Sequence, residues 1–130
     1  MSSGYSATPQ ARKLGIRAGM RVDLVDARGW QLTDPPDFTP AVDGPADVVV
    51  WFVRQATELA DAATLGERVF PAGALWVAWP RKAAGHHSDV SENAIRDAVL
   101  PIGLVDVKVA AIDDDWSGLK LVWRKENRAR

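Results

Sequence analysis

Residues 81–89 bring together the chemical groups of an active site: two cations, both histidines of the chain and a carboxylate. His86, His87 and Asp89 suit zinc or a similar ion, but adjacent residues of a turn rarely point at one ion. A histidine acting as a general base would need a neighbouring nucleophile and an orienting group, and no complete set can be read from the sequence. We therefore predict neither a metal site nor a catalytic centre here.

The cations of this segment support a different chemistry. Arg81 and Lys82, together with Arg54 from another part of the chain, carry the guanidinium and ammonium groups that usually donate to phosphate or carboxylate. They predict an anion site. In the alternative, these cations pair with the acidic cluster at residues 113–115 and bind no ligand.

The positions of these groups depend on the strands around them. Residues 20–26, with Val22, Leu24 and Val25, predict the first core strand, and the apolar runs at residues 47–53 and 74–79 predict two buried strands. The run at 47–53 is apolar on both alternating faces, as in a strand that helices cover on both sides. Residues 105–112 alternate apolar and partly polar positions, and residues 119–124 return with the same period after a turn, which predicts a terminal antiparallel hairpin.

Helical segments separate the predicted strands. Thr8-Pro9 can begin a short helix that Gly15 closes in a left-handed conformation. Apolar residues recur at helical spacing over residues 56–69. A further helix is expected over 89–100, because Asp89 and Glu92 have the spacing of a capping box.

The remaining segment, residues 27–46, contains four prolines. We expect a loop there, with one helical turn near residues 30–32 and a short edge strand near residues 38–42. Because buried strands alternate with helices, we predict a three-layer α/β fold, with a mainly parallel sheet that ends in the antiparallel hairpin.

Composition limits the classes of function. The 130 residues are 47% hydrophobic and 25% charged, which suits one globular domain with an ordered core over 8–124 and flexible tails at 1–7 and 125–130. The net charge of -1 supplies no field that would attract nucleic acid. The absence of cysteine excludes disulfides and thiolate sites. Since no secretory signal or membrane-spanning run is present, we expect a cytoplasmic protein without nucleic-acid or membrane partners.

Several segments resemble class I methyltransferases, a family with a Rossmann-like fold. LGIRAGMRVDLVDA resembles the first strand of that family, ADVVVWFV the fourth, and VFPAGALWVAWP the loop and fifth strand. The family holds a nucleoside cofactor on a glycine-rich turn after the first strand, where the backbone approaches the ligand closely. Here that turn reads Asp26-Ala27-Arg28-Gly29-Trp30, with one glycine and a bulky tryptophan, so we expect no bound cofactor.

A second resemblance covers almost the whole chain. The segments GYSATPQARKLGI, WPRKAAGHHSDVSENAIRD and GLVDVKVAAIDDDWSGLKLVWR are similar to a bacterial family of short proteins that form a domain of unknown function. This resemblance implies the fold and a cytosolic bacterial setting, and it carries no activity.

Ligands of open parallel sheets bind beyond the carboxyl ends of the strands. The predicted topology brings several polar and aromatic side chains to that rim, and we predict that they form a binding site: Arg54, Trp79, Arg81, Lys82, Asp113, Trp116 and Lys120. The cations would neutralise the ligand, Trp116 would cover an apolar or aromatic part, and Asp113 would orient the donors. In the alternative, Trp116 is a turn plug that folds back over the sheet.

The sequence therefore predicts a non-catalytic binding module for a small anionic ligand or a protein partner. A second hypothesis is an enzyme, either a degenerate methyltransferase or one with His86 or His87 as general base and Asp113 or Asp115 as second carboxylate. A third is a homo-oligomer that associates through its last strand, because the apolar surface at 119–123 would be an adhesive edge if it were unpaired.

Overall fold

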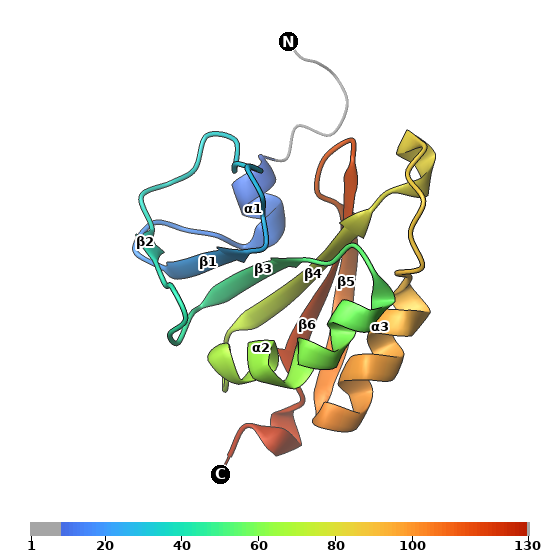
Figure 1. Cartoon of the computed structure of the whole chain (residues 1–130). Coiled ribbons are helices and arrows are strands. Elements are labelled where there is room, and N and C mark those ends of the chain that lie inside the picture. Colours follow the sequence, from blue (N-terminus) through green and yellow to red (C-terminus); the bar gives the residue numbers. More distant parts are fainter. Residues whose placement is uncertain (1–8, 130) are drawn as a thin grey trace.

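The architecture is a six-stranded sheet flanked by helices, seen in a computed structural model that describes residues 9–129 (Figure 1). The strands are β1 (Arg21–Val25), β2 (Thr39–Pro40), β3 (Val48–Phe52), β4 (Ala74–Pro80), β5 (Leu104–Ala111) and β6 (Trp116–Trp123). The helices are α1 (Gln10–Leu14), α2 (Ala62–Arg68) and α3 (Glu92–Val99). Short 3-10 turns are η1 (Ala56–Asp61), η2 (Lys82–Ala84), η3 (Leu100–Ile102) and η4 (Lys125–Asn127).

The strand order is β2-β1-β3-β4-β6-β5. Strands β1 to β4 pair in parallel, whereas β6 is antiparallel to both β4 and β5. The predicted α/β fold, with a mainly parallel sheet and a terminal antiparallel hairpin, is confirmed. Because β6 is paired on both sides, the condition for association through an unpaired last strand is not met, and β5 forms that edge of the sheet.

Two apolar clusters cover the two faces of the sheet. Residues of η1, α2 and α3 pack on one face, and α1 with part of the 27–46 segment packs on the other (Figure 1). The central strand β3 contributes to both clusters, since Val49 and Trp51 face the first and Val50 and Phe52 face the second. This division explains the uninterrupted apolar run in the sequence.

The helix predicted over 89–100 begins later than expected. Ser91 is its N-cap, and its Oγ accepts the backbone N–H of Ala94 at 3.1 Å. The Asp89 cap was a wrong prediction, because Oδ1 of Asp89 accepts the N–H of Ala56 at 2.8 Å and so ties this loop to η1. The Asp89 carboxylate is therefore engaged in a contact distant in sequence, and the hydroxyl group of Ser91 caps the helix.

The 27–46 segment contains the expected short edge strand, β2, but not the helical turn predicted near 30–32. The backbone N–H of Trp30 donates to the carbonyl oxygen of Ala27 at 3.1 Å and closes a turn. The Trp30 side chain packs against the apolar cluster on the sheet. At the other predicted helix, Gly15 closes α1 with a φ of 75°, as expected. The predicted Thr8 position lies outside the described residues.

No helix within residues 9–129 has the length and apolarity needed to cross a membrane.

Arg68, at the end of α2, fastens the helix to β1 and to the loop before β3. Its Nη1 lies 2.8 Å from Oδ2 of Asp23, and its side chain is 12% exposed. The same guanidinium donates to the carbonyl oxygens of Gly44 (2.9 Å) and Ala41. A largely buried cation with three acceptors stabilises the fold because removing it leaves a carboxylate without its partner.

Replacing Arg68 by Met should therefore lower the free energy of unfolding by about 3 kcal/mol, as expected when one partner of a buried ion pair is lost. Urea denaturation measures this loss. Arg96→Met is the matched control, since Arg96 makes ion pairs with Glu92 and Asp106 nearer the surface and should cause a clearly smaller loss. Equal losses in the two variants would contradict this account.

Candidate functional site

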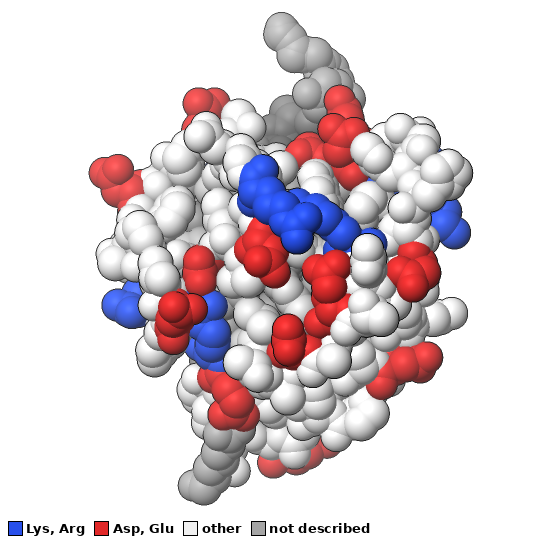
Figure 2. Space-filling model, in the orientation of Figure 1, with Lys and Arg blue, Asp and Glu red and all other residues white. Residues whose placement is uncertain are grey.

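The strand order makes the carboxyl ends of β1 and β3 the topological switch point of the sheet, and the space between these two ends is the switch-point crevice. The chain leaves β1 toward β2 on one side, and it returns to β3 on the other side. In open α/β sheets, such a switch point is where ligands bind. Figure 2 shows Lys and Arg side chains gathered over the carboxyl ends of the central strands, with Asp and Glu side chains close around them.

Aromatic side chains fill this crevice. Phe52, at the end of β3, has the ring of Trp30 at a centroid distance of 4.9 Å and the ring of Trp116 at 4.9 Å, the latter edge-on. The guanidinium of Arg54 lies over the Trp116 ring, 5.0 Å from its centroid. Nη1 of Arg54 also donates to the carbonyl oxygen of Asp26 at 2.9 Å, which joins the ends of β1 and β3.

The environment of Arg54 is unusual for a cation at the surface. Partial burial lowers the pKa of Arg54, and the positive charge of Arg28 nearby lowers the pKa further. A guanidinium in this position is stabilised by the face of an aromatic ring. Arg54 therefore links the turn after β1 to the Trp116 ring, through its Nη1 and the face of its guanidinium group.

The carboxylate of Asp113 joins the crevice to the hairpin turn. Its Oδ2 accepts the indole N–H of Trp30 at 2.8 Å. Its Oδ1 accepts the backbone N–H groups of Asp115 and Trp116, each at 2.8 Å. Arg81 supports the same turn, because its Nη1 donates to the carbonyl oxygen of Asp113 at 3.2 Å and its backbone N–H donates to Asp115.

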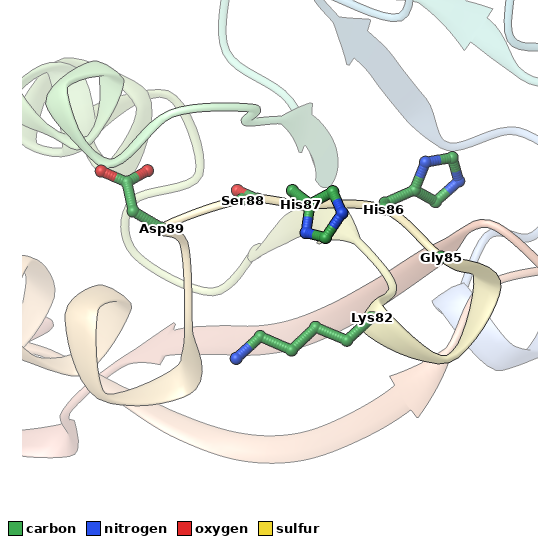
Figure 3. A pocket seen from close by; sticks show the side chains of 6 residues that line it. All are labelled: Lys82, Gly85, His86, His87, Ser88 and Asp89. Atoms are coloured by element: carbon green, nitrogen blue, oxygen red, sulfur yellow. The ribbon is translucent and has the colours of Figure 1, made fainter.

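An open recess lies beside this closed crevice, beyond the end of β4. It has a volume of about 830 Å³ and is lined by Lys82, Gly85, His86, His87, Ser88 and Asp89 (Figure 3). A second hollow of about 510 Å³ lies along Trp79, Lys82, Ser117 and the first residues of α3. Lys82 belongs to both, so the two hollows meet at its side chain.

Most polar groups around the first recess already have partners. Nε2 of His86 lies 2.9 Å from Oδ1 of Asp115. Oγ of Ser88 donates to the carbonyl oxygen of Arg54 at 2.8 Å and accepts the N–H of Val90. Lys82 differs, because no carboxylate or carbonyl group within residues 9–129 holds its ammonium group.

The residues predicted for the rim thus divide into three groups. Arg54, Arg81, Asp113 and Trp116 meet at the crevice and the hairpin turn. Lys82 lines both the open recess and the second hollow, whereas Trp79 lines only the second hollow. Lys120 lies further along β6, opposite Trp76 and Lys108 in the sheet register.

Two residues of the crevice were not in the predicted set. Phe52 was hidden in an apolar strand, and no local pattern distinguishes it from its core neighbours. Trp30 follows Gly29 in the turn after β1, at the place where methyltransferases have a glycine-rich cofactor loop. A bulky aromatic residue at that place was the sequence signal that could have identified Trp30 as part of the crevice.

The chain matches a protein-family model over most of its length. A family model described as "Protein of unknown function (DUF3052)" matches residues 15–125. No curated protein matches the sequence.

Solved structures share the fold at low sequence identity. Magnesium protoporphyrin IX methyltransferase (ChlM) from Synechocystis PCC 6803 has a TM-score of 0.53 and 14% identity, over 82% of this chain and 71% of that chain. Aeropyrum pernix fibrillarin has a TM-score of 0.55 and 13% identity, over 87% and 73%. A protein of the NADB-Rossmann superfamily from Streptococcus agalactiae has a TM-score of 0.50 and 12% identity, over 95% and 70%.

The Synechocystis and Aeropyrum structures contain S-adenosyl-L-methionine, a nucleoside cofactor. The turn after β1 holds Asp26 and Arg28 at φ of 57° and 50°, and it offers the side chains of both where a glycine-rich turn would expose backbone. Trp30 and Trp116 fill the space above Phe52. These residues do not fit a nucleoside cofactor at the switch point.

Asp113→Asn tests the contact between the crevice and the hairpin. The remaining amide oxygen can still accept the two backbone N–H groups, whereas the amide NH2 would face the Trp30 indole N–H, donor against donor. We expect the free energy of unfolding in urea to fall by about 2 kcal/mol, and the indole N–H of Trp30 to exchange faster with solvent. Asp114→Asn is the matched control, and an equal effect there would contradict the assignment.

Proposed function

Because the chain belongs to DUF3052, a family of proteins of unknown function, and has a methyltransferase-like fold whose switch point is filled, we propose that it is a non-catalytic binding module for a small anionic ligand. The ligand lies in the recess at Lys82, beside the closed crevice.

The observation that carries this proposal is the contrast between Lys82 and the two neighbouring arginines. Arg54 and Arg81 donate to carbonyl groups of the chain itself. The ammonium group of Lys82 has no acceptor within residues 9–129, and Figure 3 shows its side chain directed from η2 toward the start of α3. An ammonium group that borders two hollows is available to an anion from solution.

Groups of the second hollow, which adjoins the recess at Lys82, complement this lysine. The first residues of α3 line the hollow, and the N-terminus of a helix carries partial positive charge and unpaired N–H groups. The half-buried ring of Trp79 provides an apolar surface on the same side. This combination favours a ligand with a carboxylate or phosphate group and a flat or apolar body.

The histidines support binding more than catalysis. The His86–Asp115 pair is half of a general-base arrangement. However, the hydroxyl group of Ser88 donates to the carbonyl oxygen of Arg54, and no hydroxyl group within residues 9–129 bonds to His86. A base without an aligned nucleophile does not make a covalent catalyst.

A thermal-shift screen with phosphorylated metabolites and carboxylates tests the proposal, because a ligand that binds the folded state raises the melting temperature. For the compound giving the largest shift, Lys82→Ala should weaken binding roughly 10- to 100-fold, as expected for the loss of one charge-assisted hydrogen bond. Lys108→Ala, an exposed lysine on β5, is the matched control and should bind as the wild type does. Equal dissociation constants for the wild type and Lys82→Ala would contradict a binding site at Lys82.

A further inference from the structure

The crevice between the ends of β1 and β3 is filled by two indole groups, those of Trp30 and Trp116, and is separate from the recess at Lys82. We propose that Trp116 is a built-in ligand of the switch-point crevice: its indole group occupies the place of a planar ring ligand, so that no nucleoside binds there. The proposal concerns a different site from the anion recess and stands independently of it.

The position of the indole group is the first argument. A ligand at the switch point would rest on the carboxyl end of β3, and the residue there is Phe52, which is fully buried. The Trp116 ring meets this floor edge-on, with an interplanar angle of 89°. Trp30 meets the same floor at 47°, so two indole groups together cover one phenyl ring.

The interactions around the two indole groups are the second argument. A planar heteroaromatic ligand needs a ring to pack on, a cation or dipole over its face, and an acceptor for its N–H groups. For Trp116, Phe52 is the ring and the Arg54 guanidinium lies over its face at 5.0 Å. The acceptor, Asp113, serves the N–H of the neighbouring indole group of Trp30 at 2.8 Å. The chain thus supplies the site, and its two indole groups occupy the site together.

The covalent attachment is the third argument. Trp116 begins β6, directly after the hairpin turn, and its backbone is held by Asp113 and by the N–H of Ile112, which donates to the Trp116 carbonyl at 2.8 Å. A tethered group competes at an effective concentration in the millimolar range or above. Free nucleosides would have to displace an indole group that is always present at that concentration.

Removing the indole group should therefore create a vacancy that a free indole molecule fills. For Trp116→Ala, indole at ten times its Kd should raise the melting temperature by about 5 °C, from mass action on the folded state. The wild type should show no shift, because its crevice is occupied. Leu65→Ala is the matched control: Leu65 is buried in the cluster on the opposite face of the sheet, and the smaller vacancy there cannot admit an indole ring.

Stabilisation of the wild type or of Leu65→Ala by indole to the same extent would overturn the proposal, as would a folded Trp116→Ala variant that does not respond. If Trp116→Ala fails to fold, the wild type provides the test. Nuclear Overhauser contacts between the ring protons of Trp116 and Phe52 should be present in solution, since the centroids lie 4.9 Å apart. Their absence would show that the indole group leaves the crevice, and this would overturn the proposal.

Discussion

The carboxylate of Asp113 holds together the part of the molecule that closes the crevice. It accepts the indole N–H of Trp30, a residue 83 positions earlier in the chain, and it also accepts two backbone N–H groups of its own turn. The turn after β1 and the terminal hairpin are thereby fixed against each other. Hydrogen bonds to an ionised acceptor are among the stronger ones in proteins, and these bonds keep Trp116 over Phe52.

This constraint divides the rim of the sheet into a closed and an open part. In the closed part, the guanidinium group of Arg54 packs on the Trp116 ring, and that of Arg81 donates to the carbonyl oxygen of Asp113. Lys82 follows Arg81 in the chain, but its side chain is directed from η2 toward the start of α3 and borders the two hollows. A fold that binds nucleoside cofactors in other proteins thus keeps its shape here with its own aromatic side chains in the crevice.

Much of the fold was predictable because its signals are local. The apolar run of β3, the period of the hairpin and the left-handed Gly15 each depend on a few consecutive residues. The cap of α3 was not predictable in the same way, because Asp89 and Ser91 are both good caps and the choice depends on Ala56, far away in sequence. At the site, the rule about carboxyl ends brought together segments that do meet in the fold, and a ligand site there stays a prediction. Which cations were free depended on contacts across the fold that no local pattern contains.

Adenosine monophosphate distinguishes the two parts of the rim in one measurement, because it carries both a nucleoside and an anionic group. Titrated into isotope-labelled protein, it should shift the amide signals of residues 82–93 and the indole signal of Trp79, and it should leave residues 26–30 and the indole signal of Trp30 unchanged. Shifts centred on residues 26–30 and Trp30 would mean that the crevice opens to a nucleoside, and they would contradict this account.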